Sequence, residues 1–198
     1  MATLTTNPPT FSTIATSLRR LYFARSAFAV VWALLVALTA STLSPLSTFL
    51  LLLYPLVDLA AAVVDRRASR ATKPAPALFV NMTLSLAAAI ALGWAVSSGL
   101  ASVLLVWGAW AITAGIVQLI VAVSRRAVGG QWPMILSGGI SVLAGTGFIL
   151  QSGGPSVSLT SLAGYATLGG VFFLISAVRL QRGDKGNTRR PPDAEQGR

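Results

Sequence analysis

Six apolar runs divide this chain of 198 residues, and each is long enough to cross a membrane as a helix. Crossing the hydrocarbon core takes about 20 helical residues. Hydrophobic residues make up 54% of the chain and charged residues only 10%, which is too apolar for a soluble domain of this length. The sequence therefore predicts an all-α membrane protein with transmembrane helices at 26–43, 46–64, 77–97, 100–123, 133–151 and 157–178.

The breaks between the apolar runs alternate between short, uncharged segments and longer, basic ones. The first, third and fifth breaks consist of Ser44-Pro45, Ser98-Gly99 and residues 152–156, where Ser, Gly and Pro favour tight turns. A tight turn places consecutive helices side by side. We therefore expect a transmembrane domain at 26–178 that is made of three helical hairpins, at 26–64, 77–123 and 133–178.

The 15 Lys and Arg residues lie before the first run, in the second and fourth breaks, and after the sixth run. The three short breaks carry none. Because cytoplasmic loops hold the excess of positive charge, this pattern predicts a multi-pass membrane protein with both termini in the cytoplasm. The same rule accounts for the net charge of +10. We expect anionic lipids of the cytoplasmic leaflet as partners, and no nucleic acid.

Residues 1–25 form the predicted cytoplasmic N-terminal segment. Apolar side chains recur there at helical spacing from Phe11 to Tyr22, beside Arg19 and Arg20, which favours a short helix in the membrane interface. A cleaved signal peptide is an alternative for the first run, but the region around Thr39 lacks a good cleavage site and a second run follows at once. The arginine pair is only a weak twin-arginine export signal, because stop-transfer charge explains it equally well.

Residues 179–198 form the predicted C-terminal tail. They are rich in Gly, Pro and charge and have no apolar periodicity. We expect a disordered, basic cytoplasmic tail.

Similar segments recur in the second, fourth and sixth runs, about 55 residues apart, as in chains built from a duplicated unit. Each begins with an aromatic residue, at Tyr54, Trp110 and Tyr165. A matched pair follows four and five residues later: Asp58-Leu59, Ala114-Gly115 and Gly169-Gly170. The pattern indicates a repeated hairpin that packs on its copies.

Aromatic and glycine positions in the later runs carry a resemblance to a known family. They are Trp110, Gly115, Gln118, Gly129, Gly130, Gln131, Trp132, Gly138, Gly139, Gly145, Pro155, Tyr165, Gly169 and Gly170. In these residues the chain resembles the HdeD-like family of small bacterial inner-membrane proteins, whose biochemical function is unknown. The first hairpin departs from the pattern because it lacks the glycines. The resemblance implies a role in stress or acid resistance at the plasma membrane.

Small residues recur four positions apart on three of the predicted helices. In lipid, close approach through small side chains drives helix packing. We expect helix contacts, within the chain or between protomers, at Ala111, Gly115, Ser137, Ser141, Gly145, Ala166 and Gly170. A homo-oligomer and a complex with other membrane proteins both remain open.

Asp58 is the one acidic or basic residue inside the predicted spans. A carboxylate in the membrane is costly and usually faces a bundle interior or a water-filled cavity. At a rise of 1.5 Å per residue, Asp58, Asn81 and Gln118 lie roughly 10 to 12 Å below the cytoplasmic boundary. They form a candidate polar layer. It could be an ion or proton site. We favour the alternative that Asp58 is protonated or amide-paired as an interhelical tie, or is reached by cytoplasmic water, because a single acid makes a poor relay.

Aromatic residues have structural interpretations. Trp132, at the end of a span, is expected to anchor the interface, while Trp94, Trp107, Trp110 and Tyr54 are expected to fill packing space.

The chain has no Cys and no His, so thiol catalysis, disulfides and Cys/His metal sites are excluded. Paired acids or Ser with a buried base cannot be assembled from the spans either, so we predict no enzyme, no metal and no cofactor. The first interpretation is a non-enzymatic inner-membrane protein of HdeD-like type that acts in acid or envelope stress tolerance. The alternative is a small oligomeric transporter or proton-permeation module that uses Asp58.

Overall fold

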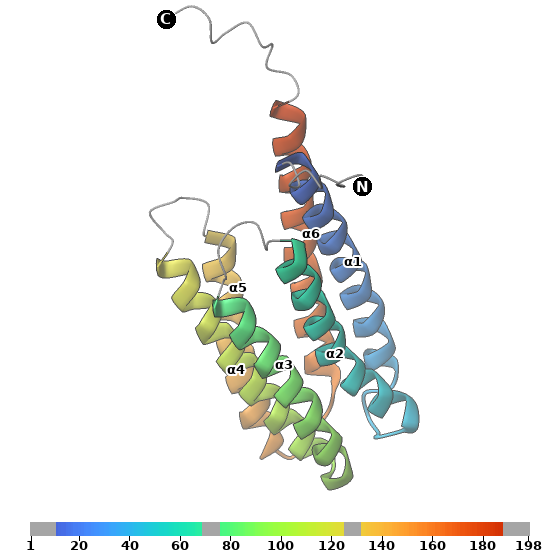
Figure 1. Cartoon of the computed structure of the whole chain (residues 1–198). Helices are drawn as coiled ribbons and strands as arrows, with labels where there is room; N and C mark the ends of the chain where they lie inside the picture. Colours follow the sequence, from blue (N-terminus) through green and yellow to red (C-terminus); the bar gives the residue numbers. More distant parts are fainter. Residues whose placement is uncertain (1–10, 69–75, 125–131, 188–198) are drawn as a thin grey trace, which may run out of the picture.

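Six long α-helices account for most of the structure, a computed structural model that describes residues 11–68, 76–124 and 132–187 (Figure 1). The helices are α1 (Phe11–Leu38), α2 (Pro45–Ala68), α3 (Pro76–Ala95), α4 (Leu100–Ser124), α5 (Trp132–Ser152) and α6 (Thr160–Asn187). A short 3-10 turn, η1 (Val96–Ser98), follows α3. Each long helix contains a stretch that is long and apolar enough to cross a membrane. The predicted all-α class and the six transmembrane helices are therefore confirmed.

The tight turns follow from local chemistry. At the start of α2, Ser44 and Ser47 accept hydrogen bonds from each other's backbone N–H, at 3.1 and 2.8 Å. This reciprocal cap satisfies two N–H groups that would otherwise lack partners, and Pro45 stands at the first helical position, where no N–H is needed. Between η1 and α4, Gly99 has a φ of +99°, a conformation that favours glycine. The turn at Gly99 matches the predicted short break, whereas the first turn is longer than predicted, because α1 ends at Leu38 and Pro45 already belongs to α2.

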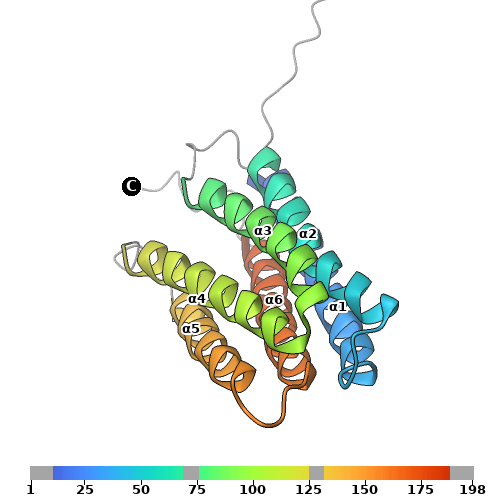
Figure 2. The same cartoon turned by 90° about the horizontal axis from the view of Figure 1, so that it is seen from below.

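The helices follow one another around the bundle in chain order, as the view along its axis shows (Figure 2). The closest pairs are α4 with α5 and α1 with α6, so the first and last helices of the chain lie side by side. In contrast, α5 and α6 pack least closely of the neighbouring helices, although a short turn joins them. The α5–α6 pair therefore depends on packing against other helices, chiefly α4 on one side and α1 on the other.

The two chain ends differ from the prediction. α1 is one continuous helix from Phe11 to Leu38, so the short N-terminal helix is an extension of the first span and not a separate element. α6 likewise continues to Asn187, which makes residues 179–187 helical where a disordered tail is predicted. Helix α6 meets no proline in these residues that would stop it. Residues 1–10 and 188–198 lie outside the described residues.

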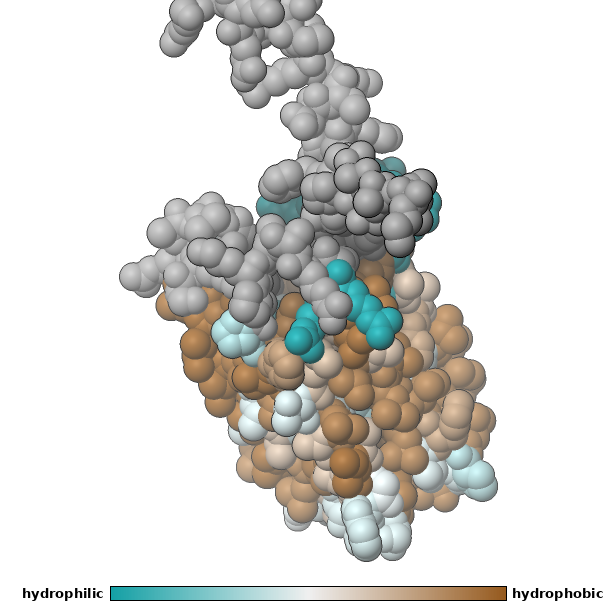
Figure 3. All heavy atoms as spheres, viewed as in Figure 1, coloured by the Kyte–Doolittle hydropathy of each residue, from teal (hydrophilic) through white to brown (hydrophobic). Residues whose placement is uncertain are grey.

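The flank of the bundle is apolar, and charge gathers at one end (Figure 3). The exposed side chains along the flank include Leu34, Leu38, Leu143 and Leu150, each of which is 62 to 75% exposed. Arginines lie near the start of α1 and at the C-terminal ends of α2 and α6, which share the end of the bundle where α1 begins and α6 ends (Figure 1). We call this the arginine end. A bilayer would cover the apolar flank.

Aromatic side chains fill the centre of the bundle. Trp32, Tyr54 and Trp107 meet with ring centroids 4.6 to 5.5 Å apart, and Trp110 lies 5.1 Å from Trp107. These distances are typical of packed aromatic pairs. Tyr54, Trp107 and Trp110 thus fill packing space, as the sequence predicts. The prediction is wrong for Trp94, however, because its side chain is 77% exposed.

The two most exposed tryptophans lie near helix ends. Trp132, which is 78% exposed, is the first residue of α5, and Trp94 lies one residue before the end of α3. An indole at the edge of the hydrocarbon can bury its ring among lipid and turn its N–H toward water. Both positions suit interface anchors at opposite ends of the bundle.

Small residues close the α4–α5 contact. A Cβ atom added to Gly115 would lie 2.7 Å from the carbonyl oxygen of Gly138, and one added to Gly145 would lie 2.6 Å from that of Gly108. The Cβ atom added to Gly115 would also lie 2.9 Å from the Cβ of Ser141. Only glycine lets these two backbones approach so closely. These predicted packing residues therefore form contacts within the chain.

The remaining predicted packing residues have different surroundings. Gly170 faces α1, where an added Cβ would lie 3.3 Å from the Cβ of Ala29. Ala111 and Ala166 are buried in the core. Ser137 is half-buried, and its carbonyl accepts a hydrogen bond of 2.9 Å from the Ser141 hydroxyl within α5.

Candidate functional site

Asp58 lies on α2, one turn beyond Pro55, whose side chain is fully buried. Proline lacks a backbone N–H and weakens the helix at the preceding turn. There, the Trp32 indole on α1 donates a hydrogen bond of 2.6 Å to the carbonyl oxygen of Leu50. This bond holds α1 against α2 about two turns from Asp58, on the side away from the arginine end.

Three side chains from two neighbouring helices donate to Asp58. Arg25 on α1 forms an ion pair with Oδ1 through Nη2. Asn81 and Ser85, which lie one turn apart on α3, both donate to Oδ2, over 3.0 and 2.8 Å. Hydrogen bonds that involve an ionised group are the stronger ones, so the carboxylate ties α1, α2 and α3 together.

Arg25 also reaches α6. Its guanidinium carbon lies 4.2 Å from the centroid of the Phe173 ring, a distance typical of cation–π contacts. The side chain of Arg25 is 22% exposed and that of Asp58 is 13% exposed. The protein thus covers most of both side chains, and their pairing offsets part of the desolvation cost of holding two charges within the bundle.

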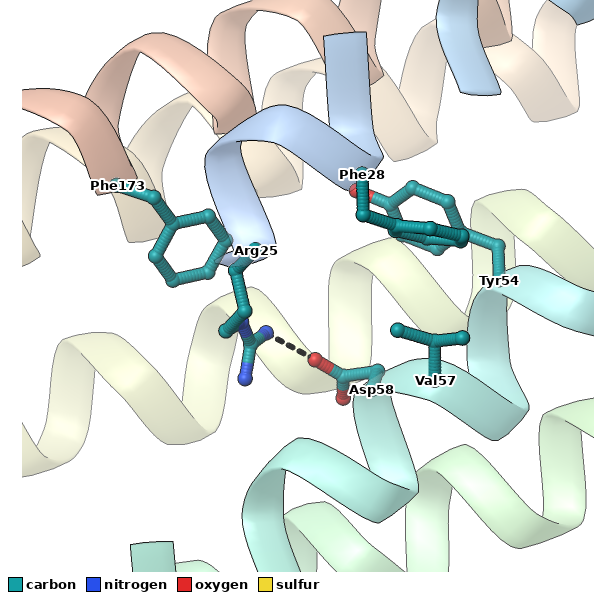
Figure 4. A pocket seen from close by; sticks show the side chains of 6 residues that line it. All are labelled: Arg25, Phe28, Tyr54, Val57, Asp58 and Phe173. Carbon is teal, nitrogen blue, oxygen red and sulfur yellow. Dashed lines mark hydrogen bonds and ion pairs between the residues drawn. The ribbon is translucent and has the colours of Figure 1, made fainter. Parts of the chain in front are cut away.

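A small pocket lies beside the ion pair, between α1, α2 and α6 (Figure 4). Its lining residues are Arg25, Phe28, Tyr54, Val57, Asp58 and Phe173. In Figure 4 the guanidinium of Arg25 lies between the ring of Phe173 and the carboxylate of Asp58. The pocket volume of about 20 Å³ is close to what a single buried water molecule requires.

The structure brings together two of the three residues in the predicted polar layer. Asn81 donates to Asp58, whereas Gln118 on α4 is half-buried and is not among the described donors to that carboxylate. Asp58 is not the only charged side chain at this level of the bundle, because Arg25, which directly precedes the predicted first span, reaches it and forms an ion pair. Its partner neutralises the acid.

Sequence reasoning missed Arg25 and Ser85 for different reasons. Arg25 was grouped with Arg19 and Arg20 as charge outside the membrane, although it lies more than a helical turn farther along α1. Ser85 is four residues after Asn81 and therefore on the same face of α3. That spacing was a usable signal. Arg25 offered no such signal, because tertiary packing decides which face of α1 meets α2.

Other polar groups in the interior differ in whether they have a hydrogen-bond partner. The Tyr165 hydroxyl on α6 lies 3.0 Å from the Ser141 hydroxyl on α5 and shares a hydrogen bond with it. By contrast, the indole N–H groups of Trp107 and Trp110 are buried and have no hydrogen-bond partner among the described residues. Buried donors without acceptors are unusual.

Chemically, the arrangement is an engaged ion pair. Both oxygens of Asp58 accept hydrogen bonds, and the carboxylate's charge is balanced by Arg25. Such an arrangement positions helices, and it can take up a proton only if Arg25 loses its partner.

Comparisons of the chain with models of protein families, with curated proteins and with solved structures find no match. The resemblance to the HdeD-like family remains a prediction from the residues given above.

Proposed function

We propose that this chain is a non-enzymatic, multi-pass protein of the bacterial plasma membrane, with both termini in the cytoplasm, that contributes to acid or envelope stress tolerance. The membrane location is supported by six apolar helices. The orientation is supported by the arginines, because cytoplasmic segments hold the excess of positive charge. The role in stress tolerance rests on the HdeD-like resemblance of the residues in the later helices.

The observation that carries the non-catalytic, non-transporting part of the proposal is the engagement of Asp58. Its two oxygens already hold Arg25, Asn81 and Ser85. Farther from the arginine end, the centre is filled by Trp32, Tyr54, Trp107 and Trp110. Asp58 therefore serves as a tie between helices, and the protein acts through contacts in the membrane or at its cytoplasmic face.

One observation favours a second candidate, a proton-permeation module. A water-sized pocket borders Asp58 and Arg25, and both side chains are partly exposed. Protons move through hydrogen-bonded water, so this pocket could begin a path. The aromatic centre is the obstacle to it, because such a path must cross the packed rings.

Reconstitution into liposomes separates the two candidates. A pH-sensitive dye inside the liposomes reports proton entry after an external acid shift, with liposomes lacking protein as the baseline. We expect wild-type and Asp58→Asn proteins to leave the rate at that baseline, because neither opens the aromatic centre. Proton entry that wild type accelerates and Asp58→Asn abolishes would establish the second candidate and refute the first.

The Asp58→Asn variant also has a folding control. Asn keeps an acceptor oxygen for Asn81 and Ser85 but loses the charge that holds Arg25. Gel filtration and circular dichroism in detergent should show a folded protein of wild-type size. An Asp58→Leu variant, which loses every hydrogen bond at this position, gives the lower limit of stability for the comparison.

A further inference from the structure

We propose that the contact between α5 and α6 opens sideways into the bilayer and that acyl chains of the surrounding phospholipid fill the opening. The name α5–α6 seam is used for the contact of Ser141, Phe148 and Gln151 on α5 with Ser161 and Tyr165 on α6. Such an opening goes beyond the role in stress tolerance. It can be measured on purified protein whether or not that role is correct.

The two helices of the seam are each bound closely to a different helix. α5 is interlocked with α4, because a Cβ atom added to Gly145 would lie 2.6 Å from the carbonyl oxygen of Gly108. α6 lies against α1, and Leu159, directly before α6, donates its backbone N–H to the carbonyl of Ala40 over 3.1 Å. Figure 2 shows these two pairs around the bundle. Each side of the seam is therefore fixed to its own partner helix.

The seam itself is held more loosely. Two described hydrogen bonds cross it. The hydroxyls of Ser141 and Tyr165 lie 3.0 Å apart, and the Ser161 hydroxyl donates to Oε1 of Gln151 over 2.6 Å. The rings of Phe148 and Tyr165 meet edge to face, with 5.7 Å between centroids. Because α5 and α6 are also the least closely packed neighbours, the seam is the weakest place in the ring of helices.

The surrounding lipid makes such a seam easy to part. In water, separating two helices exposes apolar side chains at a large cost. Acyl chains are as apolar as leucine, so membrane helices are held together by close packing and hydrogen bonds instead. The α4–α5 contact has that close packing and the seam lacks it. A gap between helices at this depth fills with acyl chains, because they are the solvent there.

The hydrogen bonds across the seam are replaceable. The Ser141 hydroxyl also donates to the Ser137 carbonyl over 2.9 Å, so it keeps a partner when α6 withdraws. Gln151 and Ser161 each lie one residue from a helix end beside the α5–α6 turn, where water can take over their hydrogen bonds. The main loss falls on the Tyr165 hydroxyl. Tyr165 therefore sets how readily the seam opens.

Rotation of the α4–α5 pair about the axis of α4 is the motion that fits these constraints. It carries α5 away from α6 and keeps the glycine contacts between α4 and α5. Trp107, whose ring packs on those of Trp32 and Tyr54, lies on α4 itself and stays in the aromatic centre. Phe148, which is 3% exposed, is the side chain of α5 that the rotation uncovers to lipid.

Distances between pairs of spin labels, measured in liposomes by pulsed electron paramagnetic resonance, test the opening. The chain has no cysteine, so introduced cysteines are labelled specifically. Leu143→Cys on α5 with Leu168→Cys on α6 spans the seam, and Leu143→Cys with Ile116→Cys spans the α4–α5 contact. These three side chains are 44 to 73% exposed, so labels there leave the packing intact. The seam pair should show a second, longer distance, and the α4–α5 pair a single narrow one.

One variant tests which group holds the seam shut. Tyr165→Phe loses the hydroxyl that bonds Ser141 and keeps the ring against Phe148. It should raise the ratio of the longer to the shorter distance by about threefold, the effect of losing one average interhelical hydrogen bond. Thr167→Ala is the matched control, because the Thr167 hydroxyl bonds the Ala163 carbonyl within α6. If Tyr165→Phe fails to fold, the two label pairs in otherwise wild-type protein still decide the matter.

Photocrosslinking tests what fills the opening. Benzoylphenylalanine, which reacts with C–H bonds on illumination, is placed at Phe148, at exposed Leu143 or at fully buried Trp107, and the protein is illuminated in phosphatidylglycerol liposomes. Mass spectrometry should find a phospholipid adduct at positions 143 and 148 and none at 107. A seam pair as narrow as the α4–α5 pair would overturn the opening. An adduct at position 143 alone would overturn its filling by lipid.

Discussion

The Ser85 hydroxyl on α3 donates a hydrogen bond of 2.8 Å to Oδ2 of Asp58 on α2. Asn81, one turn earlier on α3, donates to the same oxygen over 3.0 Å, and Arg25 on α1 pairs with the other oxygen. One carboxylate therefore holds three consecutive helices. Because α1 also packs on α6, the tie reaches the last helix of the chain.

Replacing Ser85 by Ala should weaken this tie. The variant removes one interhelical hydrogen bond from a buried position, and such bonds contribute about 0.6 to 1.7 kcal/mol in membrane proteins. We expect a loss of that size in the free energy of unfolding, measured by SDS titration in mixed micelles. The control is Ser97→Ala, because the Ser97 hydroxyl bonds within its own segment, to the Trp94 carbonyl, and is exposed. Equal stability of the two variants would contradict the interhelical role.

Glycine substitutions should distinguish the α4–α5 contact from the lipid-facing surface. In Gly145→Ala the new methyl group would lie 2.6 Å from the Gly108 carbonyl oxygen, and the backbone of α4 would have to move. Overpacking of this kind costs about 1 to 3 kcal/mol. At Gly147, two residues on, an added Cβ meets nothing within 4 Å. Gly147→Ala should therefore be neutral or stabilising, because Ala favours helix by up to about 1 kcal/mol over Gly.

The same SDS titration checks the glycine pair. A destabilised Gly147→Ala variant would show that this face is also packed, for example against a second copy. An unaffected Gly145→Ala variant would mean that α4 and α5 are not in close contact.

The orientation can be tested directly because the chain contains no cysteine. Single cysteines at Ser41 and Ser156, in the short turns, should react with a membrane-impermeant maleimide added to intact cells. Single cysteines at Arg20 and Arg182 should react only after the membrane is permeabilised, because the proposed orientation places the positive ends inside. Labelling of the arginine positions in intact cells would reverse the proposed topology.

Much of the architecture could be predicted from the sequence because membrane helices are specified by local composition. A run of about 20 apolar residues has few alternatives to a transmembrane helix, since lipid offers the backbone no hydrogen-bond partners. Depth along a helix also follows from residue number. That arithmetic correctly placed Asp58 and Asn81 at one level of the bundle, where they are hydrogen-bonded.

The remainder depends on tertiary packing. Gln118 lies at a similar predicted depth. Whether its side chain faces Asp58 depends on the rotation of α4 about its own axis, and because α4 is apolar on all sides, the sequence does not reveal that rotation. Arg25 directly precedes the predicted first span, which begins at residue 26, and arginine is costly in lipid. Its ion pair with Asp58 and its contact with Phe173 offset that cost. Both contacts come from residues more than 30 positions away in the sequence.

The two ends of the chain illustrate the same limit. Gly, Pro and charge in residues 179–198 favour disorder, yet α6 continues to Asn187. A helix that has already formed across the membrane adds further turns at little cost, because its nucleus exists. Composition alone does not include that advantage.

The most direct test of the account is survival of the organism that produces this chain after acid or envelope stress, compared between the parent strain, a deletion strain, and deletion strains complemented with wild-type or Asp58→Asn protein at equal membrane abundance. We predict that deletion lowers survival and that both proteins restore it, because Asp58 acts as a tie between helices whose remaining contacts Asn can keep. Unchanged survival of the deletion strain would contradict the role in stress tolerance. Restoration by wild type but not by an equally abundant Asp58→Asn protein would contradict the structural role of Asp58.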